Sequence, residues 1–138
     1  MDVSLAEAEK ELAEDLAMLE EWDDRYEYII SLGRALPPYP DELRTEDREV
    51  QGCQSQVWLD ARYEGGRVWF RADSNALITK GLVAMLVNLY TGRTPDEIRS
   101  GTLDFLKDIG LETHLTPSRV NGLQATHRRI QEHAAQWA

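Results

Sequence analysis

The 138-residue sequence contains a single cysteine, Cys53, and lacks the patterns that mark most classes of enzyme. One thiol cannot form a disulfide within the chain or a Cys-x-x-Cys redox pair, and it supplies at most one ligand to a metal ion or an iron–sulfur cluster. There is no glycine-rich phosphate loop, no His-Glu-x-x-His helix and no Gly-x-Ser-x-Gly elbow. Internal repeats and low-complexity tracts are also absent. The thiol is therefore the main candidate for chemistry.

Long apolar runs and an excess of positive charge are missing as well. Although 42% of the residues are hydrophobic, no run approaches the roughly 20 residues of a membrane span, so we expect a soluble globular protein without a membrane role. The formal charge of −10 argues against nucleic acid and favours a partner with a basic docking surface, although the same charge would serve solubility alone. The acidic start of the chain lacks the basic region of a secretion signal. With a free thiol, this predicts a cytoplasmic protein.

The length suits one domain, which we take as residues 1–138, with an acidic N-terminal helix within 1–21 and the remaining core in 22–138. Apolar residues at helical spacing predict an amphipathic helix over residues 4–20. A second helix should run from Trp22 to Gly33. Prolines then forbid a helix, so residues 36–47 should form a loop.

Two alternating segments around Gly65-Gly66 predict a β-hairpin. A two-residue turn places Glu64 opposite Arg67, Arg62 opposite Trp69 and Asp60 opposite Arg71. On the other face Tyr63 meets Val68 and Ala61 meets Phe70. Two of these pairs are opposite charges and one sets a cation over an indole, each contributing roughly 0.2 to 1 kcal/mol. The other face is apolar and must be covered by helices.

Further elements are expected on either side of the hairpin. We expect a third short strand at residues 48–51 and a central buried helix over residues 77–89, capped by Asp73 or Ser74. Gly81 within that helix costs about 1 kcal/mol relative to alanine, which indicates close packing against a neighbour.

The C-terminal part should be helical. Thr94-Pro95-Asp96-Glu97 predicts a capping box, residues 103–109 a short helical piece, and Thr116-Pro117 the start of the last helix. His127 lies in the apolar stripe of that helix and should be a hydrogen-bonded core histidine. We place His114 in a loop and expect His133 to face solvent.

Cys53 lies in a polar stretch directly before the hairpin. An unpaired cysteine is commonly a small buried hydrophobic residue. Gly52, however, permits unusual backbone angles, and Gln51, Gln54 and their neighbours are too polar for a core strand. We therefore expect Cys53 at a turn that a partner can reach.

The segment Gly52-Cys53-Gln54-Ser55-Gln56-Val57-Trp58 resembles the signature of the SufE proteins, which accept persulfide sulfur from a cysteine desulfurase during iron–sulfur cluster assembly. Further residues resemble family positions in the same order, from about Trp22 to the last helix: Trp22, Tyr26 to Ile30, Leu32-Gly33, Leu36-Pro37, Asp73-Ser74, Lys80 to Leu82, His114 to Arg119 and Gly122-Leu123. The chain departs from the pattern at Arg48, where asparagine is expected, and in the acidic segment before Trp22.

The resemblance implies an α/β (α+β) fold, similar to SufE and the IscU scaffold, with a small three-stranded antiparallel sheet covered by helices. It implies that Cys53 carries the sulfur and that Gln54, Ser55 and Arg119 lie near the thiol or the docking surface. The implied partners are a cysteine desulfurase of the SufS or CsdA kind, which holds the pyridoxal phosphate itself, and a downstream iron–sulfur scaffold. No cofactor or metal is expected on this chain.

Three classes of function remain on the residues alone. In a sulfur acceptor, the Cys53 thiolate attacks a donor persulfide and keeps the terminal sulfur, and no resolving cysteine is needed. In a cysteine hydrolase, His114 would act as base with an aspartate to orient it. In a non-catalytic interaction module, the cysteine is incidental. The resemblance favours the sulfur acceptor.

Overall fold

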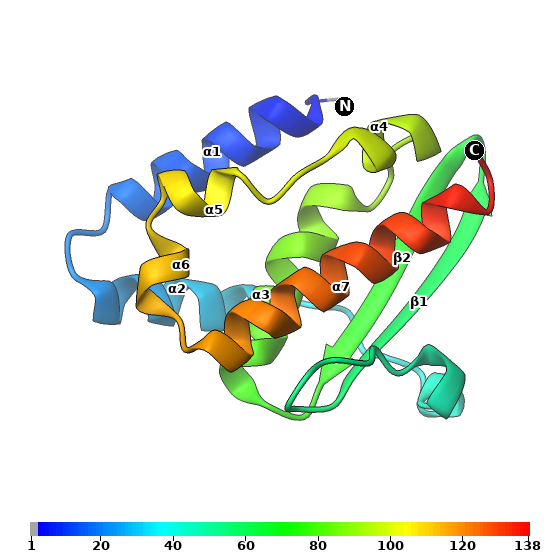
Figure 1. The fold of residues 1–138 in the computed structure, drawn as a ribbon, viewed down its shortest axis with the longest axis horizontal. Helices are drawn as coiled ribbons and strands as arrows, with labels where there is room; N and C mark the ends of the chain where they lie inside the picture. Colours follow the sequence, from blue (N-terminus) through cyan, green and yellow to red (C-terminus); the bar gives the residue numbers. More distant parts are fainter. Residues whose placement is uncertain (1–2) are drawn as a thin grey trace.

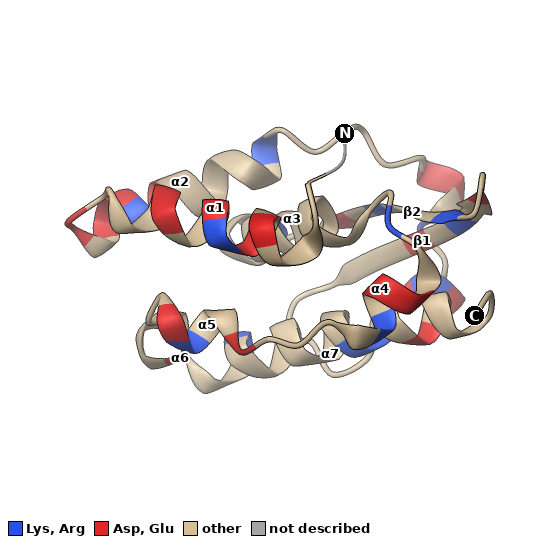
Figure 2. Ribbon diagram, turned by 90° about the horizontal axis from the view of Figure 1, so that it is seen from above, with Lys and Arg blue, Asp and Glu red and all other residues tan. Residues whose placement is uncertain are grey.

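A computed structural model describes residues 3–138, so the first two residues of the predicted domain lie outside the described part. The helices and strands run in the order α1 Leu5–Ala17, α2 Trp22–Arg34, β1 Val57–Glu64, β2 Arg67–Ser74, α3 Leu77–Tyr90, α4 Pro95–Ser100, α5 Phe105–Asp108, α6 Leu111–His114 and α7 Pro117–Ala135. Figure 1 shows α7 crossing in front of α3 and the β1–β2 hairpin. Seen from above, α1, α2 and α3 form one layer and α4 to α7 another, with the hairpin at one end (Figure 2). The α+β fold expected from the sequence is confirmed.

The hairpin has the predicted register, with Asp60 opposite Arg71 and Arg62 opposite Trp69. Asp60 and Arg71 form a salt bridge of 2.6 Å, and the guanidinium carbon of Arg62 lies 6.0 Å from the Trp69 ring centroid. The third polar pair differs, because Glu64 bonds Arg62 of its own strand while Arg67 donates to the Gly92 carbonyl at 2.8 Å. The turn thus determined the register of the hairpin, but it did not determine the partners of Glu64 and Arg67 at the exposed tip.

The sheet has two strands in the described residues, so the predicted third strand is wrong. Glu49 forms a single bridge to Trp58, and the Val50 amide donates to the Val57 carbonyl at 2.8 Å. A 3₁₀ turn at Glu46–Arg48 precedes this contact and a tight turn at Gln51 follows it. Between these two turns the segment is too short to form a ladder.

The first two helices form as expected, although α1 ends at Ala17, three residues before the predicted end. Its N-terminus has a capping box between Ser4 and Glu7 that the sequence analysis missed. The predicted loop of residues 36–47 contains the 3₁₀ turn Asp41–Leu43 and the start of the second one.

Helices α2 and α3 cross at two glycines. A Cβ on Gly33 would lie 2.8 Å from the Gly81 nitrogen, and one on Gly81 would overlap the carbonyl of Ile29. The prediction that Gly81 marks close packing is confirmed. The predicted cap of α3 is wrong: its N-cap is Ala76, whose amide donates to Ser74 Oγ at 3.3 Å. Asp73 instead holds Arg44 and Lys80 at 2.7 and 3.2 Å.

The C-terminal helices begin as predicted at Thr94-Pro95 and Thr116-Pro117. The capping box at Thr94 is half formed, since Thr94 accepts from the Glu97 amide while the Glu97 carboxylate bonds the Leu5 amide at 3.0 Å. That contact fixes α1 on α4. The short helix α5 lies within the predicted piece, and α6 was not predicted.

The three histidines have different surroundings. His127 is 8% exposed and shares a hydrogen bond of 2.9 Å with the Tyr90 hydroxyl, as predicted. His114 ends α6 instead of lying in a loop, and its ring stacks on Trp22 at 3.8 Å. His133 was expected to face solvent but is half-buried: its ring packs edge-on against Phe70, because the sheet reaches that flank of α7 as well as the apolar stripe.

Candidate functional site

The cysteine turn is a six-residue connection, 51–56, closed at its base by the Val50–Val57 hydrogen bond. Gly52 adopts a φ of +91°, in the left-handed region that favours glycine, so the chain reverses there. Cys53 therefore lies in a turn directly before β1, where the sequence analysis expected it.

Two contacts hold the arms of this turn. On the first arm, Arg129 of α7 donates to the backbone carbonyls of Asp47 and Glu49. On the second arm, Asn75 accepts from the Gln56 amide at 3.1 Å and donates its own amide to the Gln56 carbonyl at 3.3 Å. The tip that carries Cys53 thus projects from a fixed base.

Arg48, the residue that departs from the SufE pattern, donates to Asp60 at 3.3 Å and to Thr45 at 3.0 Å. These partners belong to the hairpin and the preceding loop. The arginine at position 48 therefore links the preceding loop to the hairpin and does not bond to the cysteine turn, residues 51–56.

The Cys53 thiol is half-buried against α7. Its S–H donates to the Gly122 carbonyl, with Sγ 3.7 Å from the oxygen. Burial raises the pKa of the Cys53 thiol above its ordinary value, and the hydrogen bond that the nearby Thr126 hydroxyl can give to the thiolate offsets part of that rise. At neutral pH the resting sulfur is consequently a protonated thiol of low nucleophilicity.

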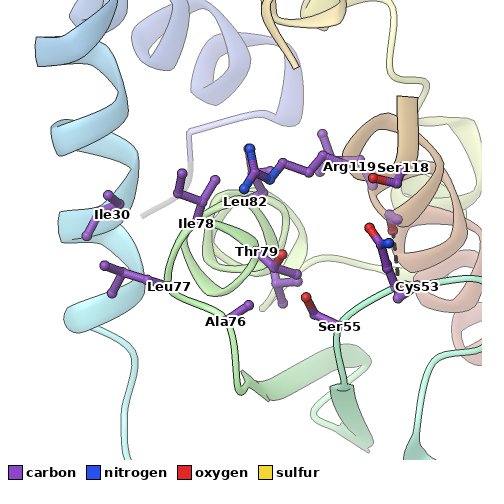
Figure 3. A pocket seen from close by; sticks show the side chains of 14 residues that line it. Ile30, Cys53, Ser55, Ala76, Leu77, Ile78, Thr79, Leu82, Ser118 and Arg119 are labelled. Carbon is purple, nitrogen blue, oxygen red and sulfur yellow. Dashed lines mark hydrogen bonds between the residues drawn. The ribbon is translucent and has the colours of Figure 1, made fainter. Parts of the chain in front are cut away.

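A cavity of about 350 Å³ opens beside the sulfur (Figure 3). Cys53, Gln54 and Ser55 of the turn, together with Arg119 of α7, contribute to its wall. All four site residues predicted from the sequence therefore border one space. The rest of the lining comes mainly from apolar and small side chains: Ile30, Ala76, Leu77, Ile78, Thr79, Leu82, Val83, Ser118, Gly122 and Leu123.

Arg119 is the single charged residue among those that line the cavity. Its side chain extends from α7 toward Ile78 and Leu82, whereas Cys53 lies on the opposite side of the space (Figure 3). Leu77, 53% exposed, adds an apolar side chain at the rim. The opening thus combines one cation, exposed apolar surface and a thiol.

Other kinds of site find little support in residues 3–138. No group of three or more His, Cys, Asp or Glu in that range could hold a metal ion. None of its helices has both the length and the hydropathy needed to cross a membrane. No histidine borders the cavity, and His114 Nδ1 instead lies 3.2 Å from the Gly110 carbonyl. The proposed base of a cysteine hydrolase is therefore not at the thiol.

Two residues of the site were missed. Gly122 brings its carbonyl and its bare Cα against the sulfur, and Thr126 places a fully buried hydroxyl one helical turn later. Gly122 could have been found, because a glycine inside a predicted helix indicates close packing against a neighbour, as it did at Gly81. Thr126 carried no signal of its own.

Known proteins resemble this chain over almost its full length. The solution structure of a hypothetical protein from Thermus thermophilus superposes with a TM-score of 0.76 and 26% identity, covering 94% of each chain. An uncharacterized SufE-like protein of Rhizobium meliloti (strain 1021) is 42% identical over 129 residues, which is 90% of this chain and 92% of that protein. A second one, from Rhizobium etli, is 39% identical over 129 residues, 90% of this chain and 87% of that protein.

The family model described as SufE, Fe-S metabolism associated domain, matches residues 10–134. The match begins inside α1, before the Trp22 at which the sequence resemblance starts, and it ends in the last turn of α7. It spans the cysteine turn and every wall of the cavity. The chain therefore belongs to the SufE family, whose domain is associated with iron–sulfur metabolism.

Proposed function

We propose that this protein accepts persulfide sulfur on Cys53 from a cysteine desulfurase, stimulates that enzyme and passes the sulfur on for iron–sulfur cluster assembly. The observation that carries the proposal is the half-buried thiol of Cys53 beside a largely apolar cavity of about 350 Å³, in a SufE domain. The cavity offers room for a second sulfur atom. Its wall contains no further thiol that would discharge the cargo, because Cys53 is the only cysteine in the sequence.

The transfer step requires no oxidant or reductant. The Cys53 thiolate attacks the outer sulfur of the donor's R–S–SH group, a new S–S bond forms, and the S–S bond of the donor breaks. The donor leaves as a thiolate and Cys53 becomes a persulfide. Pyridoxal phosphate, which generates the donor persulfide, belongs to the desulfurase.

The resting thiol suits a carrier that reacts only with its partner. Because burial raises the pKa of Cys53, the free protein presents little thiolate to small electrophiles in solution. The partner then has to expose or ionise the sulfur. Gly52 at the base of the tip and the exposed Gln54 beside the thiol allow such a movement.

Docking is the role that we propose for the rim of the cavity. Arg119 follows Thr116-Pro117-Ser118 in the first turn of α7, where a cation is unfavourable for the helix dipole, so its position serves something other than helix stability. Together with the exposed Leu77 and the polar Gln54 and Ser55 it frames the thiol. A partner surface that fits would cover Leu77 and place an acceptor against Arg119.

The test is intact-mass measurement after incubation with cysteine and a desulfurase of the SufS or CsdA kind. The wild-type chain should gain sulfur that a reductant removes, and Cys53→Ser, with its fold checked by circular dichroism, should gain none. Arg119→Ala should load more slowly but reach the same final mass, because it affects docking and not the acceptor atom. Sulfur retained on the serine variant, or none on the wild type, would refute the proposal.

A further inference from the structure

Three groups meet at the sulfur on its α7 side. The Cys53 S–H and the Thr126 hydroxyl both donate to the Gly122 carbonyl, at 3.7 Å and 2.8 Å. Thr126 is completely buried, whereas Cys53 is half-buried. One carbonyl therefore accepts from two side chains, and the second donor is shielded from water.

This arrangement suits only one chemical state of Cys53. In the thiol, Sγ carries a proton and donates. In the thiolate, and equally in a persulfide, the sulfur bonded to Cβ carries no proton and can only accept. The Gly122 carbonyl is also only an acceptor, so each of these states turns two acceptors toward each other across 3.7 Å.

We propose that Thr126 is a positioning residue for Cys53, whose hydroxyl turns from the Gly122 carbonyl to Sγ when the sulfur loses its proton to solvent or accepts the transferred sulfur. The movement is a rotation about the Cβ–Oγ bond, so no heavy atom has to shift. The Gly122 carbonyl keeps its backbone hydrogen bond within α7, so losing the bond from Thr126 costs the helix little free energy.

Geometry and chemistry agree on this role. Both side chains reach the same Gly122 carbonyl, so a rotated Thr126 hydroxyl faces the sulfur, and its hydrogen bond to the thiolate lowers the pKa of Cys53 against the effect of burial. Because the Thr126 hydroxyl is shielded from water, its hydrogen bond to a charged acceptor is stronger than that of an exposed hydroxyl. Thr126 would then hold the nucleophile in the cavity during attack and hold the inner sulfur of the persulfide afterwards. This second role rests on the proposed function, whereas the first does not.

The experiment is the pH dependence of Cys53 alkylation by iodoacetamide in the free protein. Thr126→Val keeps the shape and removes the hydroxyl, so the midpoint of the alkylation profile should rise by about one pH unit. At pH 7 the thiolate fraction falls about tenfold, and greater intrinsic nucleophilicity recovers part of this, which leaves a rate loss of about three- to fourfold. Thr126→Ser keeps the hydroxyl and should restore the wild-type midpoint.

Two controls keep the result interpretable. Thr79→Val removes a hydroxyl from the same cavity wall, and it should leave the midpoint unchanged. Thr126→Ala repeats the measurement with a different effect on packing, so a shift caused by repacking would differ between the Val and Ala variants. Equal midpoints for wild type and both hydroxyl-free variants would overturn the proposal.

Sulfur loading from the desulfurase is a second experiment, independent of the alkylation profile. Thr126→Val should load more slowly than wild type, and its persulfide should be lost faster to a small thiol. If the midpoint shifts while the wild-type protein itself takes up no sulfur, the hydrogen-bond exchange stands and the proposed function fails. If sulfur is carried normally and the midpoint does not move, the function stands and the role of Thr126 fails.

Discussion

The glycines at the crossing of α2 and α3 differ from those at the cysteine site in how much space surrounds them. At the crossing, a Cβ on Gly33 would lie 2.8 Å from backbone and one on Gly81 would overlap the Ile29 carbonyl. At the site, a Cβ on Gly122 would lie 3.7 Å from the Cys53 sulfur and one on Gly52 3.3 Å from Ala125. The first pair permits no added atom without moving a helix. The second pair leaves ordinary or only slightly tight contacts.

This difference separates a rigid frame from a site that tolerates movement. The crossing fixes α3, and α3 in turn supports both the hairpin and the floor of the cavity. The cysteine tip, in contrast, lies against α7 at Gly122, Ala125 and Thr126. Its one hydrogen bond to that helix among the described residues is the one from Cys53 to the Gly122 carbonyl. The proposed role as a sulfur carrier, in which the sulfur must move to meet a donor, would use a firm base with a loosely held tip.

Gly81→Ala should give the largest effect on stability. The new methyl group has to displace the Ile29 backbone, so we expect a loss of about 3 kcal/mol in the free energy of unfolding, measured by urea denaturation. The gain in helix propensity, about 1 kcal/mol, is too small to compensate. Gly66→Ala is the matched control: nothing lies within 4 Å there, and only its φ of +79° opposes a side chain, which costs about 1 kcal/mol. Equal losses for the two variants would contradict a closed crossing.

His133, near the C-terminal end of α7, is half-buried and not fully hydrogen-bonded within the described residues. His133→Leu should therefore stabilise the protein. His133 Nε2 is buried without a hydrogen-bond partner among the described residues. Removing an unpaired buried polar atom should stabilise the protein by about 1 kcal/mol at pH 7. His133→Asn, which keeps a polar group but does not titrate, should gain less.

The pH dependence sharpens this prediction. Burial and nearby Arg129 hold the pKa of His133 below its ordinary value of 6.5, against the opposing effects of Asp60 and Glu132. The unfolded chain therefore binds more protons, and wild-type stability should fall as the pH drops through about 6.5. The advantage of His133→Leu should grow between pH 7 and pH 5, as followed by urea unfolding. An advantage that stays constant over this range would show that His133 does not titrate differently in the two states.

Gly122→Ala should give the smallest change in stability, with the opposite sign to Gly81→Ala. Alanine is favoured over glycine inside a helix, and the 3.7 Å contact is ordinary, so we expect a gain of up to about 1 kcal/mol. The methyl group would nevertheless crowd the sulfur, and alkylation of Cys53 should slow several-fold. A loss of stability comparable with that of Gly81→Ala would show that the site is as tightly closed as the crossing.

How much of this could be predicted follows from the distance between interacting residues along the chain. The register of the hairpin was predicted in full, because a two-residue turn determines every facing pair. The third strand was wrong because residues 48–51, Arg-Glu-Val-Gln, contain one apolar side chain and give no measure of how far pairing extends. The turn at Cys53 was also predictable, since Gly52 and its polar neighbours act locally.

The surroundings of the sulfur were not predictable in the same way. Gly122 lies 69 residues from Cys53, and no local pattern connects the two. His133 was misplaced because spacing along α7 identifies the apolar stripe but not how widely the sheet covers the helix on either side. The SufE resemblance identified four site residues that line the cavity, Cys53, Gln54, Ser55 and Arg119, whereas the hydrogen bonds that hold the thiol required the fold.

The bare Cα of Gly122 has a consequence for how this sequence can change over generations. A random library screened only for heat resistance should select alanine at this position, because alanine stabilises a helix relative to glycine and its methyl group meets no steric clash here. If Cys53 carries sulfur as proposed, the same library screened for growth under demand for iron–sulfur proteins should reject alanine, because its methyl group crowds the sulfur. Residue 122 is thus a position where selection for stability and selection for the proposed function favour different residues.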